Sequence, residues 1–157
     1  MSLFYLGAAL LTASALSPPV SVAVELLRTH AGTAVSALEQ SQAEAFWTTF
    51  RATVAREDWA AVANMTATPL WVRGEVDQVP PQKVVGKNLP MILSRLMTQS
   101  VYLGKGKPMR PLAAWVRETE RLSASHWVAN DQIRFYALEF RKIKDSWKLT
   151  AMYSEDL

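Results

Sequence analysis

The chain has 157 residues, half of them apolar, and it contains no cysteine. This length fits one domain with a sizeable core, since domains usually contain about 100 to 150 residues. The lack of cysteine excludes disulfides, thiolate catalysis, iron–sulfur clusters and cysteine-ligated zinc. The net charge is only +3, from 17 basic and 14 acidic side chains, so a nucleic-acid-binding role gains no support from it.

The N-terminal residues 1–23 carry no charged side chain. They run apolar over residues 3–11 and then pass into small residues and the Pro18-Pro19 pair. This pattern predicts an export signal that is cleaved after Ala23, which places the mature protein in a periplasmic or secreted location. The alternatives are an uncleaved membrane anchor and a buried N-terminal helix. The two prolines argue against an anchor, because they would break a spanning helix.

The next segment, residues 24–40, shows no sustained period and predicts a linker or a loosely attached helix. We expect the folded domain to cover residues 41–157. Ser41 and Glu44 have the spacing of a capping box, which predicts that a helix begins there. Apolar residues then recur at three- and four-residue spacing, as in an amphipathic helix. They are Phe46, Trp47, Phe50 and Val54.

The middle of the chain predicts a helix, a strand pair and another helix. Asp58 is a good N-cap for a second helix, and residues 70–76 alternate as a half-buried strand does. A turn at Pro80-Pro81 and a short returning strand follow, and Asn88 precedes the next helix. Residues 101–111 predict a loop. The polar face of the first strand consists of Trp71, Arg73, Glu75 and Asp77.

The last 35 residues predict a meander of three antiparallel strands. The strands are expected over 125–129, 133–143 and 147–153, separated by Asn130-Asp131 and by a second polar turn. The apolar phase changes within 133–143, which indicates a bulge or a sharply curved sheet. In the last strand, alternation places Trp147, Leu149, Ala151 and Tyr153 on one face. Residues 112–122 are ambiguous, and we expect a helix in their first half.

This order of elements resembles the nuclear transport factor 2-like superfamily, which includes polyketide cyclases and ketosteroid isomerase-like enzymes. The stretches that carry the resemblance are AEAFWTTFRATVAREDWAAVANMT (43–66), TPLWVRGE (68–75) and FRKIKDSWKLTAMY (140–153). The resemblance implies an α+β fold in which N-terminal helices pack on a strongly curved antiparallel sheet, a cystatin-like cone. It also implies a cavity at the open end of the cone, where enzymes of the superfamily hold an Asp or His base.

Several residues are candidates for a site in such a cavity. The catalytic candidates are His126, Glu139 and Asp77, and the pocket candidates are Trp47, Trp71, Arg73 and Tyr136. Each has a structural alternative: a strand histidine is more often structural, and a charged strand face is more often an exposed edge. Glu139 interrupts an apolar run, so it either points into the cavity or is turned into water by a bulge. No metal-ligand spacing and no cofactor motif is found.

Charge is concentrated in residues 83–121, which hold eight basic and two acidic side chains and sum to +6. Lys105, Lys107 and Arg110 are therefore candidates for an interaction surface that meets an acidic partner. The alternative is a solvated loop and helix face. Nucleic acid is not expected, because export would separate the two.

Three functional hypotheses follow. The leading one is an exported ligand-binding or protein-interaction module without catalysis, which takes a small apolar or anionic ligand and forms a homodimer through its sheet. The second is a cofactor-free isomerase, dehydratase or cyclase that uses a cavity carboxylate or histidine. The third is a partner in an envelope complex that docks through the basic segment. Membrane contact is expected only through residues 1–23, if they stay uncleaved.

Overall fold

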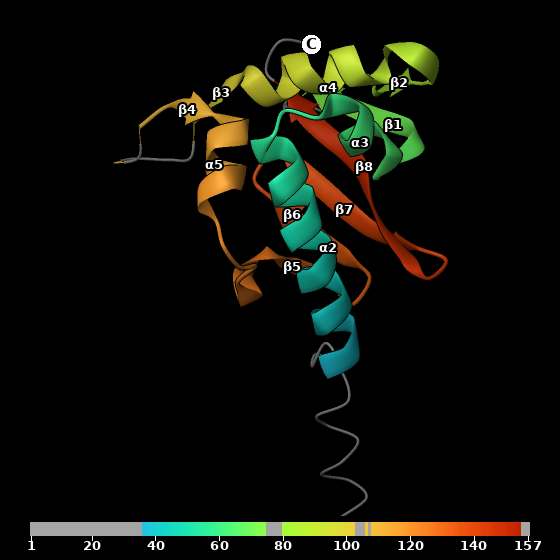
Figure 1. Ribbon diagram of the computed structural model, residues 1–157, viewed down its shortest axis with the longest axis vertical. Coiled ribbons are helices and arrows are strands. Elements are labelled where there is room, and N and C mark those ends of the chain that lie inside the picture. Colours follow the sequence, from blue (N-terminus) through green and yellow to red (C-terminus); the bar gives the residue numbers. More distant parts are fainter. Residues whose placement is uncertain (1–35, 75–79, 103–105, 107, 155–157) are drawn as a thin grey trace, which may run out of the picture. The chain divides into compact units, whose positions relative to one another are not determined.

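The computed structural model describes residues 36–74, 80–102, 106 and 108–154. Helices pack against a largely antiparallel sheet, so the α+β class is confirmed (Figure 1). In chain order the elements are α2 (Ala37–Ala55), α3 (Trp59–Asn64), β1 (Thr66–Gly74), β2 (Gln82–Val84), η1 (Gly86–Asn88), α4 (Leu89–Thr98), β3 (Ser100–Val101), β4 (Arg110–Pro111), α5 (Leu112–Glu118), η2 (Ala124–His126), β5 (Trp127–Ala129), β6 (Gln132–Phe135), β7 (Leu138–Ile143) and β8 (Ser146–Ser154).

Helix α2 begins earlier than its sequence pattern suggested. The capping box is formed by Ser36 and Glu39: the Glu39 N–H donates to the Ser36 hydroxyl at 3.2 Å, and that hydroxyl contacts the Glu39 carboxylate at 3.0 Å. The predicted box of Ser41 and Glu44 is wrong, because two Ser-x-x-Glu patterns stand five residues apart and the first one starts the helix. Glu44 instead accepts the N–H of Leu122 at 3.2 Å and ties α2 to the segment after α5.

The main sheet has six strands in the order β2-β1-β8-β7-β6-β5. Strands β1 and β8 run parallel, and every other neighbouring pair is antiparallel. In β1 the predicted alternation is confirmed over 70–73: Leu70 and Val72 are buried toward the helices, so Trp71 and Arg73 point to the other face. We call this second face the outer face of the sheet. A separate pair, β3 and β4, makes a two-stranded sheet.

The C-terminal meander has four strands rather than three. The single strand predicted over 133–143 is wrong: β6 and β7 form a hairpin in which Phe135 pairs with Leu138, and Tyr136 takes a positive φ of 52° in the two-residue turn. The phase change in the sequence marks this turn, which lacks the glycine or asparagine that usually signals one. The strand predicted over 125–129 is also shorter, because residues 124–126 form the 3-10 turn η2.

Aromatic rings fill the space between α2 and the sheet. The ring centroids of Trp47 and Phe135 lie 4.6 Å apart, and those of Phe50 and Phe140 lie 5.1 Å apart in an edge-to-face arrangement. Figure 1 shows α2 crossing the front of β6 and β7, which carry Phe135 and Phe140. Trp47 and Phe50 are fully buried, so the helix is anchored on the sheet by ring contacts that exclude water.

Replacing the central ring of this contact should lower stability strongly. We expect Phe50→Ala to reduce the free energy of unfolding by about 3 to 5 kcal/mol, because it removes a buried ring and leaves a cavity. The measurement is urea denaturation followed by circular dichroism. The matched control is Thr49→Ala, an exposed position of the same helix, which should change the free energy by no more than about 0.5 kcal/mol. Equal losses in the two variants would contradict the packing described here.

Candidate functional site

A hollow with a volume of about 400 Å³ lies on the outer face of the sheet. All of its lining residues in the described part of the chain come from three adjacent strands, β1, β8 and β7. They are Ala67, Thr68, Pro69, Trp71, Arg73, Glu139, Arg141, Ile143, Thr150 and Ala151. We call this site the outer-face hollow. It brings together three residues that the sequence singled out, Trp71, Arg73 and Glu139.

Irregular strand pairing surrounds this hollow. The parallel pairing of β1 with β8 shifts register between Thr66 and Trp71, and the pairing of β7 with β8 shifts between Glu139 and Phe140. The second shift leaves Thr150 without a ladder partner, and its hydroxyl donates to the carbonyl oxygen of Glu139 at 3.1 Å. Such irregularities bend a strand and re-aim its side chains, so the surface can sink here.

The irregularity in β8 also reverses its faces. Trp147 and Leu149 are buried toward the helices, but Ala151 pairs with Trp71 and Tyr153 pairs with Arg73 on the outer face. The prediction that all four residues share one face is therefore wrong beyond Leu149. An uninterrupted period of two was assumed, and one extra residue in a strand inverts everything that follows it.

Glu139 is buried in the wall of the outer-face hollow and is only 5% exposed. Its two carboxylate oxygens have different partners: the Arg141 Nε–H donates to Oε1 at 2.8 Å, and the Tyr153 hydroxyl donates to Oε2 at 3.3 Å. The strand does carry an irregularity at Glu139, yet the side chain points neither into the interior nor into water. A buried charge is tolerated here because it is paired and hydrogen-bonded.

Cations lie over the aromatic rings of this face. The Lys83 Nζ is 4.9 Å from the centroid of the Trp71 ring. The Arg134 and Arg73 guanidinium carbons are 4.1 and 6.0 Å from the centroid of the Tyr153 ring. The Nε atom of Arg73 is buried and has no hydrogen-bond partner among the described residues. The outer face therefore offers flat apolar surface together with positive charge, which suits an anion that has an apolar part.

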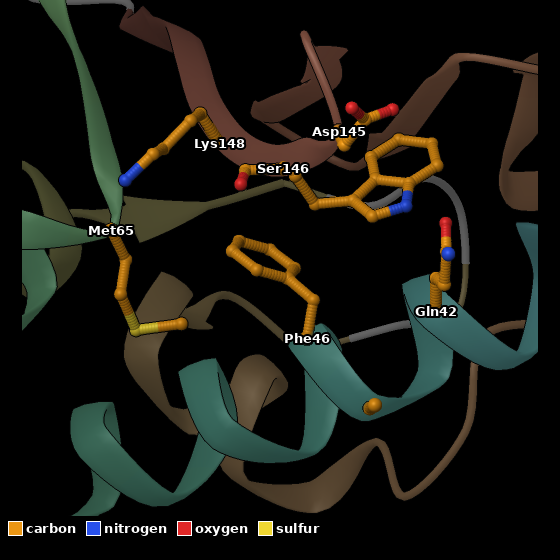
Figure 2. Close-up of a pocket in the computed structure, with 8 residues that line it drawn as sticks. Gln42, Phe46, Met65, Asp145, Ser146 and Lys148 are labelled. Carbon is orange, nitrogen blue, oxygen red and sulfur yellow. The ribbon is translucent and has the colours of Figure 1, made fainter.

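A second hollow, with a volume of about 440 Å³, lies between α2 and the turn that joins β7 to β8. Figure 2 shows Gln42 and Phe46 rising from α2 toward the segment of Asp145 and Ser146. Its one amine, Lys148 Nζ, donates to the carbonyl oxygen of Asn64 at 2.8 Å. This second hollow thus has an apolar floor, and the Lys148 ammonium is already bound by a backbone carbonyl.

His126 lies apart from both hollows. It is half-buried in η2, its Nδ1 accepts the backbone N–H of Ser123 at 2.9 Å, and its ring is 6.2 Å from that of Tyr136. Tyr136 itself sits in the β6–β7 turn. An imidazole that accepts at Nδ1 must be neutral, and burial lowers the pKa of His126 below its ordinary value. These two candidates are neighbours, but neither reaches Glu139.

The remaining candidates are placed as follows. Trp47 lies in the core and lines neither hollow, and its indole N–H donates to the Thr119 carbonyl at 3.0 Å. Arg110 is bound by the Glu118 carboxylate through both terminal nitrogens, and it stacks over Trp115 at 5.2 Å. This hydrogen bonding holds the pKa of Glu118 below its usual range. Asp77, Lys105 and Lys107 lie outside the described residues.

Sequence reasoning missed two residues that shape the outer-face hollow, Arg141 and Tyr153. The spacing of Glu139 and Arg141 was a usable signal, since residues two apart in a strand share a face. Tyr153 had no such signal, because the irregularity at Thr150 has no mark in the sequence.

Within the described part of the chain, no three His, Asp or Glu side chains gather closely enough to hold a metal ion. In the same residues, no helix is long and apolar enough to cross a membrane. Comparison with protein-family models, with curated proteins and with solved structures finds no match to this chain. A function for this chain therefore has to be inferred from its own sequence, fold and site chemistry.

The state of His126 predicts a pH dependence of stability. Its pKa is lower in the folded than in the unfolded chain, so the unfolded chain binds more protons below about pH 6.5. The stability that the neutral His126 contributes at about pH 7 is therefore lost as the pH falls below about 6.5. We expect the melting temperature of His126→Asn, which keeps an acceptor near Nδ1, to fall less between about pH 7.5 and about pH 5 than that of the parent chain. An equal fall in melting temperature for the variant and the parent chain would contradict this assignment.

Proposed function

We propose that this chain is an exported, non-catalytic binding module of the nuclear transport factor 2-like type, and that its ligand site is the outer-face hollow. The order of elements supports the family: two helices, a strand pair, a helix and a terminal meander follow one another as the resemblance implies. The export signal expected over residues 1–23 supports the location. We also propose that the sheet has the cone-like curvature that the resemblance implies.

The observation that carries the proposal is the packing of the interior. In an enzyme of this superfamily the resemblance implies a cavity between helix and sheet. Here that space holds the rings of Trp47, Phe50, Phe135 and Phe140, with centroid distances between 4.6 and 6.1 Å for the contacting pairs. A substrate would have to displace fully buried rings, which costs several kcal/mol per ring, on the order of a large-to-small core substitution.

The described lining of the outer-face hollow lacks the groups of an acid–base catalyst. General acid–base chemistry needs a proton-transferring group within reach of the substrate, usually with a second group of complementary role. Among the lining residues Glu139 is the one carboxylate, and both of its oxygens are occupied. His126 is held elsewhere by Ser123. What the hollow does offer is an aromatic wall at Trp71 and positive charge at Arg73 and Arg141, and these groups bind rather than react.

Benzoate is a suitable probe, because it joins a flat apolar ring to one carboxylate. We expect isothermal titration calorimetry to detect weak benzoate binding to the full chain, and neutral benzamide to bind less well. Arg73→Gln should weaken benzoate binding by about three- to ten-fold, since it removes a charged partner. The matched control Arg56→Gln removes an exposed arginine at the end of α2 and should change nothing.

Two results would contradict the proposal. One is equal affinity for benzoate and benzamide, which would show that the cations contribute nothing. The other is unchanged benzoate binding in Arg73→Gln, with melting curves showing that the variant is folded. A turnover assay on ketosteroid or polyketide-like substrates that gives activity lost in Phe50→Leu would favour the enzyme instead.

A further inference from the structure

The described strands of the main sheet are strongly basic. They contain six basic side chains and one acidic side chain, Glu139. By backbone register, five of these cations share the outer side of the sheet: Lys83 on β2, Arg73 on β1, Arg134 on β6, Arg141 on β7 and its partner Lys148 on β8. Lys148 already donates to the carbonyl oxygen of Asn64. Glu139 neutralises Arg141, so apart from Lys148 the cations of this face that have no acidic partner among the described residues are Lys83, Arg73 and Arg134.

Two of these cations stand at the ends of one straight row. The backbone register pairs Lys83 with Trp71, Trp71 with Ala151, Ala151 with Glu139, and Glu139 with Arg134. The row therefore crosses five adjacent strands. Because neighbouring strands are about 4.8 Å apart, the backbones at its two ends are separated by about 19 Å, and both side chains lean inward over the rings of Trp71 and Tyr153.

The cations of the row are held by aromatic rings and not by acids. Lys83 lies over Trp71, and Arg134 lies over Tyr153 at 4.1 Å, beside the row. Among the described residues neither cation has a carboxylate within ion-pair distance. Stacking fixes the plane of a guanidinium while its N–H edge can still donate, and this edge matches a carboxylate. Glu139 shows the match on this face, since its own carboxylate is bound by Arg141 and Tyr153.

The middle of the row is suited to a backbone that crosses it. Ala151 has the smallest side chain in the row, and Glu139 lies low in the surface at 5% exposure. The outer-face hollow, lined by Trp71, Glu139 and Ala151, lies at the same place. A crossing chain would thus meet a depression between two positive ends.

We propose that the outer face binds an extended acidic segment of a partner protein, laid across the strands along the row from Lys83 to Arg134. This inference rests on the proposed function, and it names the class of partner. A chain that follows the whole row needs about six extended residues, at about 3.3 Å per residue, and its acidic side chains can pair with both cations at once. A second copy of this chain does not fit, because two identical basic faces would repel each other. A lipid surface fits less well, because these cations lie on rings around a hollow and not at the tips of a flat surface.

The test uses the full chain and a fluorescent peptide that carries a Glu pair at each end of a four-residue Ser/Ala spacer. The comparison peptide has the same composition, with all four Glu in the centre. Fluorescence anisotropy should show tighter binding of the spaced peptide, weakened by added salt. Lys83→Gln and Arg134→Gln should each weaken it by about three-fold and the double variant by about ten-fold, while Arg56→Gln should not.

The outcomes separate this inference from the proposed function. Lys83 and Arg134 do not line the outer-face hollow, so their substitution should weaken benzoate binding less than Arg73→Gln does. Benzoate binding without peptide binding, or equal affinity for the two peptides, overturns the inference and leaves the binding module in place. If neither benzoate nor the spaced peptide binds, the inference and the proposed function are both overturned. A third outcome concerns lipid. If the substitutions reduce cosedimentation with phosphatidylglycerol vesicles but leave peptide binding unchanged, the face binds lipid and the inference is overturned.

Discussion

The contact between the aromatic stripe of α2 and the rings of β6 and β7 determines how the rest of this molecule can work. Trp47 and Phe50 meet Phe135 and Phe140 with no solvent between them. Once this contact forms, the helical side of the sheet is committed to the core. Charged strand residues must then lie on the other side or be paired, because an unpaired charge is too costly to bury. Most of the charged strand side chains among the described residues therefore lie on the outer face.

On that face, irregular pairing gives shape to what would otherwise be a uniform sheet surface. The shift at Glu139 and Phe140 inverts β8, so that Tyr153 stands outside and not in the core. Tyr153 then links three charged residues: it donates to Glu139, and its ring lies under Arg73 and Arg134. A local defect in the ladder thus produces a connected cluster of one ring, one acid and several cations. Such a cluster is well suited to recognition of an anion.

Much of the fold could be predicted because its signals are local. The stripe of α2, the Asp58 cap of α3 and the alternation of β1 each depend on neighbouring residues. The same alternation placed Trp71 and Arg73 together, and Glu139 was singled out because it interrupts an apolar run. The parallel pairing of β1 with β8 joins distant parts of the chain and has no local signal. The Tyr136-Ala137 turn contains no Gly, Asn or Asp, so the hairpin of β6 and β7 could not be predicted. The irregular pairing at Thr150 has no sequence signal, so the outer position of Tyr153 could not be predicted.

If ligands meet the outer face and not the space between α2 and the sheet, a tryptophan in each of these two places should respond differently to benzoate. Fluorine NMR of the chain labelled with fluorotryptophan tests this directly, because two of the six tryptophans, Trp71 and Trp47, lie in the two places to be compared. Trp71 reports the outer-face hollow, and Trp47 reports the interior. On addition of benzoate we expect the Trp71 signal, assigned by a Trp71→Phe variant, to shift while the Trp47 signal stays in place. A shift of the Trp47 signal with the Trp71 signal unmoved would show that benzoate enters the interior and would contradict the proposed site.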